Sequence, residues 1–245
     1  MLPALVLCGG RGTRLAEVTQ GAMPKAMVAV AGRPFIDYKL QSLVSSGLRD
    51  VVLSIGVGGA QIRDHVGDGS RFGVTARYVD DGPHLLGTGG AVNAALGDLP
   101  GAFWVTYGDS LVTVDVPQAE ARFRASGQLG LMTVLHNAGR WAPSNARVRD
   151  DLVVEYAKQP PPRGAQHIDY GMLILTAEAF ADERDKRAFD LAQVLTRLAT
   201  TGTLAAFEVD DRFYDIGTPE ALQVTEGYLT NRQHDPRGMS RGPAN

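Results

Sequence analysis

The 245-residue chain contains a single cysteine, Cys8. An intramolecular disulfide is therefore impossible, and this cysteine usage favours the reducing cytoplasm as the compartment. The chain also has no basic surplus, since 24 Lys and Arg against 27 Asp and Glu give a formal net charge of −3. General binding to nucleic acids or anionic membranes is disfavoured, because both require a basic surface. Any polyanion site must be local.

Long apolar runs are missing as well. No stretch approaches the ~18 apolar residues of a membrane helix, and we expect neither a membrane span nor a signal peptide. The five histidines show no spacing typical of metal ligands. With 44% hydrophobic residues the chain can bury a large core, and its length corresponds to one or two domains. These values are typical of a soluble globular protein.

Two common nucleotide-binding patterns are absent from the glycine-rich segment at residues 7–25, which reads LCGGRGTRLAEVTQGAMPK. This segment lacks the Gly-Lys-Ser/Thr end of the Walker pattern. Its glycines also fail to match the dinucleotide pattern G-x-G-x-x-G, because Leu15 stands at the third glycine position. The missing dinucleotide pattern disfavours a nicotinamide-dependent oxidoreductase.

The same segment nevertheless has the chemistry of a phosphate-binding loop. It follows a continuous apolar run at residues 2–7, which predicts a buried parallel strand, and open α/β sheets bind ligands at the carboxyl ends of such strands. Glycines let the backbone approach an anion, and Arg14 and Lys25 supply cationic donors. A plain strand-to-helix turn is the alternative, which the basic residues disfavour. The residues expected to bind the nucleotide here are Leu7, Gly9, Gly10, Arg11, Gly12 and Thr13.

Strands and helices alternate over the first half of the chain. Apolar runs predict strands at 51–54, 74–78 and 103–107, and helical spacing predicts helices around 36–44, 60–66 and 91–96. This alternation is typical of βαβ units. It predicts an α/β fold of Rossmann-like type, with a mostly parallel sheet flanked by helices.

The pattern changes after residue 110. We expect strands at 129–135 and 170–175, a hairpin over 146–156, and a strand pair near 204–215 between helices at 189–200 and 218–229. These strands predict a small substrate-side β extension of the same sheet. Residues 1–230 are thus expected to form a single domain, and residues 231–245 a flexible tail.

A second glycine cluster, Gly87-Thr88-Gly89-Gly90, stands between a predicted strand and a predicted helix. Its backbone can approach a flat base closely, so we expect Gly87 and Thr88 to contact the nucleotide. A helix N-terminus capped by Thr88 is the alternative, and the two are compatible.

Asp109 and Asp215 each follow a predicted strand and should face the phosphate loop. Two carboxylates together with triphosphate oxygens form the hard-oxygen shell that Mg²⁺ prefers. An aspartate after a strand more often has a turn or cap role. The combination with two glycine clusters favours metal binding by both residues.

These motifs make the chain resemble the sugar-phosphate nucleotidylyltransferases, over about residues 1–230. The family's opening signature is matched by residues 7–15 and its Leu-Gly-Thr-Gly element by residues 86–89. The other matching motifs are Pro24-Lys25, Gly32-Arg33-Pro34, Gly108-Asp109, and Asp215 before Gly217-Thr218-Pro219. In its short form the chain is most similar to the heptose- and mannose-1-phosphate guanylyltransferases and the short uridylyltransferases.

The resemblance implies a reaction and its parts. A sugar 1-phosphate attacks the α-phosphorus of an NTP, pyrophosphate leaves, and Mg²⁺ is the cofactor. Arg14 would hold the departing phosphates, Lys25 the α-phosphate and Lys158 the sugar phosphate. Residues 1–110 would bind the nucleotide and residues 111–230 the sugar phosphate. GTP with heptose or mannose 1-phosphate is the expected pair. Two alternatives remain open: an enzyme that uses UTP, CTP or dTTP, and a non-catalytic regulator that binds a nucleotide sugar. Assembly into a homo-oligomer also remains open.

The chain departs from the family pattern where specificity is expected. Relatives carry Glu-Lys-Pro at the sugar site, whereas this chain has Ala157-Lys158-Gln159 and so lacks the glutamate. Their Asn-Ala-Gly is replaced by Asp169-Tyr170-Gly171, which puts an acid and a phenol near the sugar. Asn145 is a further candidate for a sugar hydroxyl, with a turn role as the alternative.

The base site departs from the family pattern too. Asp80 or Asp81 would replace the usual glutamine or glutamate ahead of the second glycine cluster, and we expect Asp81 to contact the nucleotide. A carboxylate there favours a base edge that donates, such as guanine N1 and N2.

Overall fold

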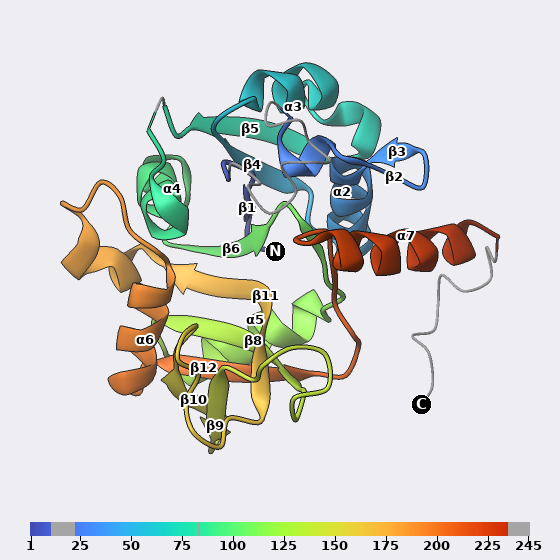
Figure 1. Ribbon diagram of the computed structural model, residues 1–245. Coiled ribbons are helices and arrows are strands. Elements are labelled where there is room, and N and C mark those ends of the chain that lie inside the picture. Colours follow the sequence, from blue (N-terminus) through green and yellow to red (C-terminus); the bar gives the residue numbers. More distant parts are fainter. Residues whose placement is uncertain (11–22, 83, 235–245) are drawn as a thin grey trace.

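A computed structural model describes residues 1–10, 23–82 and 84–234 and places nine strands in one mixed sheet (Figure 1). The strand order is β5-β4-β1-β6-β11-β8-β12-β10-β9. The first four strands in this order are mutually parallel. They are β1 (Ala4–Leu7), β4 (Asp50–Ile55), β5 (Thr75–Asp80) and β6 (Ala102–Tyr107). They confirm the strands expected from the apolar runs.

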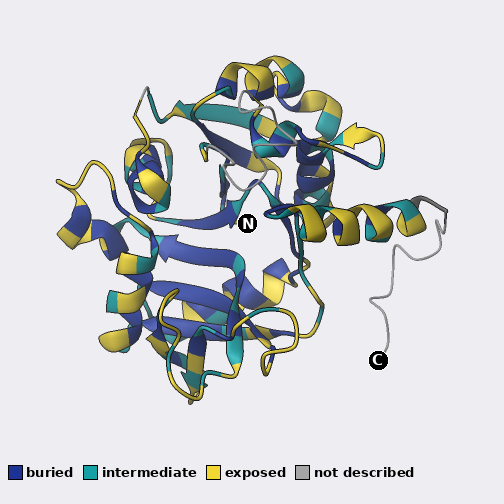
Figure 2. Ribbon diagram, in the orientation of Figure 1, coloured by how far each residue is buried: buried dark blue, intermediate teal, exposed yellow. Residues whose placement is uncertain are grey.

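Helices cover both faces of this sheet (Figure 1). Side chains alternate along β1, so Ala4 and Val6 pack with α2, α3 and α5, whereas Leu5 packs with α4 and α6 on the other face. The strands are buried, and exposed residues lie mostly on the outer sides of the helices (Figure 2). The bounds are α2 (Phe35–Ser45), α3 (Gly59–Val66), α4 (Gly87–Ala95), α5 (Val116–Ser126) and α6 (Ala192–Thr200).

The second half of the sheet differs from the expected small extension of a mostly parallel sheet. It supplies five strands, of which β11 runs antiparallel to both β6 and β8, and β10 antiparallel to both β12 and β9. Only β8 and β12 are parallel among the described strands of this half. β9 also pairs with β11, which curls the sheet back on itself. The bounds are β8 (Gly130–His136), β9 (Ala146–Arg149), β10 (Leu152–Tyr156), β11 (His167–Thr176) and β12 (Leu204–Val209).

In this half of the chain, the predicted hairpin is confirmed, because it joins residues that are neighbours in the sequence. The hairpin β9–β10 turns at Asp150 and Asp151, which have φ angles of +50° and +61°. The strand pair expected near 204–215 is wrong, because β12 joins the large sheet while β13 (Tyr214–Asp215) pairs with β7 (Ser110–Leu111). The partner of a strand depends on contacts far away in sequence, which periodicity does not record.

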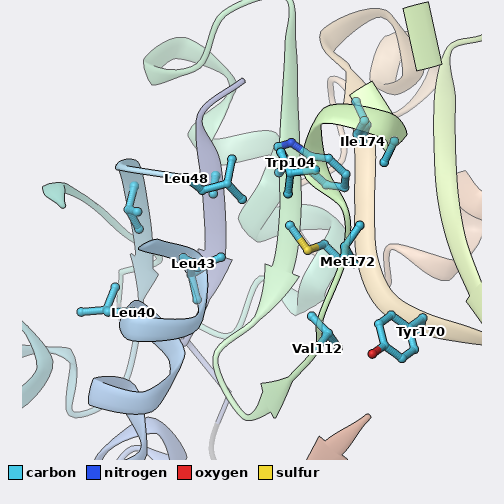
Figure 3. Packing of buried hydrophobic residues seen from close by; sticks show 14 of the residues in the cluster. Leu40, Leu43, Leu48, Trp104, Val112, Tyr170, Met172 and Ile174 are labelled. Carbon is cyan, nitrogen blue, oxygen red and sulfur yellow. The ribbon is translucent and has the colours of Figure 1, made fainter. Parts of the chain in front are cut away.

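One hydrophobic cluster ties the two halves of the sheet together (Figure 3). Trp104 of β6 is fully buried in this cluster, which also contains Leu40 of α2 and Met172 and Ile174 of β11. Its indole N–H donates to Glu120 Oε1 at 3.2 Å, so its polar atom is satisfied inside the core. This packing fixes β11 against β6 and thereby places the end of β6 relative to the second half.

The last helix, α7 (Pro219–His234), lies to one side of the sheet (Figure 1) and packs through Leu229 on Phe35 and Ile216. It continues beyond the expected end at 229, so residues 231–234 are helical, and 235–245 lie outside the described residues. No helix in the described ranges is both long and apolar enough to span a membrane. The remaining short elements are β2 (Ala29–Val30), β3 (Arg33–Pro34), η2 (Lys25–Met27), η3 (Ser70–Phe72), η4 (Leu96–Asp98) and η5 (Ala177–Glu183).

Candidate active site

A cavity of about 290 Å³ opens where β1, β4 and β6 end, beside the start of α4. Each of these strands delivers its last residues to this cavity, because parallel strands end at the same edge of a sheet. The predicted residues that line it are Leu7, Gly9, Gly10, Lys25, Asp81, Gly87, Thr88 and Asp109. Arg11, Gly12, Thr13 and Arg14 lie outside the described residues. The two glycine clusters and one of the two predicted metal ligands therefore share one cavity.

Lys25 and Asp109 form an ion pair in this cavity. Lys25 Nζ lies 3.1 Å from Asp109 Oδ2, with the side chains 15% and 33% exposed. A partly exposed pair of this kind contributes up to about 1 kcal/mol. Either partner can therefore exchange the other for a phosphate or a cation at little cost in stability.

Asp215 is brought beside Asp109 by the short β7–β13 pairing. In this register Asp215 lies opposite Ser110, and Ile216 N donates to Asp109 O at 3.0 Å. Asp215 Oδ1 accepts from Gly217 N at 2.7 Å, which helps to fix the carboxylate. Within the described residues no three His, Cys, Asp or Glu side chains group as metal ligands. Two carboxylates nevertheless suit Mg²⁺, which takes few protein ligands and completes its shell with phosphate oxygens and water.

Asp81 is a second carboxylate that lines the cavity. Its Oδ1 accepts from Ser54 Oγ at 2.8 Å, while its Oδ2 lies against Gly9, where an added Cβ would overlap it. Burial raises the pKa of Asp81, and the bond from Ser54 opposes this shift. Asp80 is exposed and accepts from Gly82 N, so of the two candidates only Asp81 lines the cavity.

Thr88 does not cap α4, so the alternative role proposed for it is wrong. The N-cap is Leu86, and Thr88 lies inside the first turn. Its hydroxyl donates to Asp190 Oδ1 at 3.2 Å and accepts from Leu191 N at 2.9 Å. Thr88 therefore ties the segment before α6 to the cavity wall.

Asp190 is a functional candidate that the sequence did not reveal. Lys158 Nζ lies 2.8 and 2.9 Å from its two carboxylate oxygens. Burial would raise the pKa of Asp190, but bonds from Lys158 and from Ala192 N outweigh it, and the pKa is lowered. Lys158 lacks the glutamate that precedes it in relatives, but it is paired with a carboxylate 32 positions away in the sequence. Asp190 stands near the start of the helix expected at 189–200, where an aspartate is commonly a capping residue.

Asp169, Gly171 and Asn145 gather in a second polar cluster. Asp169 Oδ1 accepts from Gly171 N at 3.0 Å, and its Oδ2 accepts from Tyr156 OH at 3.2 Å. Asn145 Oδ1 accepts from Asp169 N at 2.9 Å, which occupies its side-chain oxygen with the backbone. Gly171 has a φ of +89° at a bulge in β11, a conformation that favours glycine. Burial raises the pKa of Asp169.

Tyr170 is not part of this cluster, which corrects the expectation of a phenol near the sugar. It is 2% exposed and packs in the core on the opposite face of β11, edge-on to Phe213 (Figure 3). Its hydroxyl accepts from Thr113 N at 3.1 Å. Because side chains alternate along a strand, Asp169 and Tyr170 cannot both face the cavity side.

Tyr107 connects the cavity with the polar residues of the second half. It ends β6 and lines the cavity. Its pKa is raised well above the ordinary value by burial and by the charges of Asp169, Asp190 and Asp109. Its hydroxyl therefore stays protonated. In the sequence Tyr107 appeared only as the last residue of a buried strand.

Residues 3–144 match the family model of the nucleotidyl transferases. The chain belongs to this family. It is 26% identical over 220 residues to the D-glycero-alpha-D-manno-heptose 1-phosphate guanylyltransferase of Campylobacter jejuni, covering 89% of this chain and 96% of that protein. It is 29% identical over 250 residues to the mannose-1-phosphate guanylyltransferase of Mycobacterium tuberculosis, covering 98% of this chain and 66% of that protein.

The fold of this family member is shared with solved structures. The crystal structure of HddC from Yersinia pseudotuberculosis superposes with a TM-score of 0.78 at 24% identity and covers 94% of this chain and 100% of that chain. The mixed sheet with its curled second half is thus a fold known from experiment. Cys8, which lines the cavity, is a poor nucleophile, because burial raises the pKa of its thiol to about 12 and keeps it protonated.

Proposed function

We propose that this enzyme transfers GMP from GTP to a sugar 1-phosphate, with heptose or mannose 1-phosphate as the acceptor, and releases pyrophosphate. One observation carries the proposal: a single cavity is lined by Asp81 and by the Lys25–Asp109 pair, and Thr88 in its wall binds Asp190, the partner of Lys158. Asp81 suits a base, the Lys25–Asp109 pair a polyphosphate with its metal, and Lys158 a sugar phosphate. The names of the two curated guanylyltransferase relatives support the choice of base and sugar.

Positioning and charge neutralisation account for most of the catalysis. An oxygen of the sugar phosphate forms a bond to the α-phosphorus, and the bond from that phosphorus to the bridging oxygen of pyrophosphate breaks in line. Lys25 neutralises charge on the α-phosphate, Arg14 holds the departing phosphates, and Lys158 orients the sugar phosphate. Asp109 and Asp215 would hold Mg²⁺, which neutralises charge developing on the α-phosphate and the leaving pyrophosphate.

The acceptor sugar meets two carboxylates in this arrangement. Lys158 is paired with Asp190, and both side chains are about half exposed, at 44% and 50%. When the phosphate of the sugar binds Lys158 in place of Asp190, the Asp190 carboxylate is free to accept a hydrogen bond from a sugar hydroxyl. Asp169 is fixed by Tyr156 and Gly171 and offers a second acceptor. A polyhydroxylated sugar such as mannose or heptose suits this pair.

Guanine recognition by Asp81 is tested by comparing GTP with ITP, which lacks the 2-amino group. A carboxylate accepts from guanine N1 and N2 together, and losing one such bond lowers kcat/KM about 10- to 100-fold. Asp81→Asn should abolish most of this preference, whereas Asp80→Asn, whose carboxylate is exposed, should keep it. Steady-state kinetics with both triphosphates gives the ratio for each variant.

The acceptance of guanine also depends on pH. Burial raises the pKa of Asp81, so its carboxylate becomes protonated at a higher pH than usual. The KM for GTP should therefore rise as pH falls through that pKa, and it should do so less in Asp81→Asn. Turnover of UTP that equals turnover of GTP would overturn guanine as the base and leave the reaction class standing.

A further inference from the structure

Lys39 is a charged residue on the core-facing side of α2. Its side chain is 1% exposed, and Ile36 and Leu43, three and four residues away on the same helical face, belong to the core. Burial lowers the pKa of Lys39 to about 8. Burying an amine costs free energy that an apolar residue of similar size does not. Stability of the helix packing therefore does not explain a lysine at this position.

The ammonium group of Lys39 braces the turn that carries Asp109. Lys39 Nζ donates to Thr106 Oγ1 at 2.8 Å and to Ser110 O at 2.9 Å. These two acceptors flank Gly108 and Asp109, which line the cavity. Lys39 holds the turn from the α2 side, while Lys25 contacts Asp109 from the cavity side.

No carboxylate forms an ion pair with Lys39 in the part of the chain that the structure describes. Its hydrogen bonds go to neutral oxygens, so its charge is not cancelled by direct contact. The carboxylate whose charge acts on Lys39 is that of Asp109. In a buried environment this attraction is stronger than in water. The positive charge therefore lies behind the Gly108-Asp109 turn, on the side away from the contact with Lys25.

The same network reaches the sugar side. Thr106 Oγ1 donates to Gly171 O at 3.0 Å, and Gly171 N donates to Asp169 Oδ1 at 3.0 Å. Because the Thr106 hydroxyl gives its proton to Gly171, it can only accept from position 39. A hydrogen-bond donor is thus required there. The bonds run from α2 through β6 to the bulge of β11, and so connect the turn of Asp109 with Asp169.

We propose that Lys39 is a positioning residue for nucleotidyl transfer, which fixes the Gly108-Asp109 turn and, through Thr106, the Gly171 bulge. The inference rests on the proposed function, because it needs Asp109 and Asp169 to serve one reaction. Lys39 touches neither substrate, and its contribution is to hold both sides of the site in one geometry.

Lys39→Met removes the donor and the charge but keeps the length of the side chain. We expect kcat to fall about 10- to 100-fold, since small displacements of catalytic groups cost about that much. The KM for the triphosphate should change less than about threefold, because no binding group is removed. Thermal unfolding without Mg²⁺ should show only a modest loss of Tm, because removing a buried charge offsets part of the cost of leaving Thr106 Oγ1 and Ser110 O without their donor.

Leu43→Ala is the matched control on the same helical face. It leaves a cavity in the core and should lower the Tm without lowering kcat, because Leu43 is outside the network. We expect a large loss of kcat with a modest loss of Tm in Lys39→Met, and a larger loss of Tm with an unchanged kcat in Leu43→Ala. Wild-type kcat in Lys39→Met, or an equal loss of kcat in Leu43→Ala, overturns it.

Thr106 provides a second test that does not depend on the folding of Lys39→Met. Thr106→Ser keeps the hydroxyl and should retain wild-type kcat, whereas Thr106→Val should lower kcat with little further loss when combined with Lys39→Met. Equal kcat in Thr106→Ser and Thr106→Val overturns the inference. All variants are compared on the substrate pair that the wild type turns over, so an inactive wild type refutes the proposed function separately.

Discussion

Asp109→Asn is expected to lower kcat by at least about 10³-fold, because it removes one of two carboxylates for the metal and a fixed charge from the cavity. The amide fits the same space, so the fold should persist. The loss of the Lys25 ion pair should lower the free energy of unfolding by no more than about 1 kcal/mol, since the pair is partly exposed. Pyrophosphate release and a thermal melt measure the two effects.

Asp50→Asn is a matched control for this variant. Asp50 forms an ion pair with Arg77 at 3.1 Å, the same distance as between Lys25 and Asp109, on an exposed surface away from the cavity. It should lose as little stability as Asp109→Asn and keep the wild-type kcat. An Asp109→Asn enzyme with kcat near the wild-type value would remove Asp109 from the catalytic site.

Lys25→Met is expected to lower kcat/KM by about 10²- to 10³-fold, because the α-phosphate loses a cation in a site where Lys25 is only 15% exposed. Lys25→Arg should restore little of this loss, because a planar guanidinium does not replace a compact ammonium at a single phosphoryl centre. Steady-state kinetics with saturating sugar phosphate separates the effect on kcat from that on KM.

The control for Lys25 is Lys186→Met, which removes an exposed lysine from the segment before α6. It should leave kcat/KM unchanged. The double variant Lys25→Met/Asp109→Asn should lose much less than the product of the two single losses, because paired groups act as a unit. Full multiplicative losses would show that the two residues act independently and contradict the shared site.

The cavity at the ends of β1, β4 and β6 could be predicted because its signals are local. A short apolar run such as that of β1 specifies a buried strand, and the glycine cluster after it marks the point where backbone must approach a ligand. Asp109 follows its strand directly and reaches the cavity through that strand. For these residues, sequence neighbours are also neighbours in the structure.

The sugar half could not be predicted in the same way, because its contacts join segments distant in sequence. Asp190 meets Lys158 across 32 positions, and neither residue alone identifies the other. Strand direction is equally hidden, since an apolar run indicates burial and not orientation. Tyr170 points to the core because side chains alternate between the two faces of a strand, and β11 includes both Asp169 and Tyr170. Lys39 was hidden for a different reason, since a lysine on the apolar face of a helix contradicts the pattern that predicts the helix.

This family member is expected to transfer a nucleotidyl group to a sugar 1-phosphate. The most direct measurement incubates GTP labelled at the α-phosphorus with Mg²⁺ and, in turn, mannose, heptose, glucose and amino-sugar 1-phosphates. We expect the label to move into a GDP-sugar while unlabelled pyrophosphate appears in equal amount. Label that stays in GTP or is released only as GMP, with every acceptor and with UTP, CTP and dTTP as well, would contradict it. Binding of a nucleotide sugar without any transfer would instead identify a non-catalytic regulator.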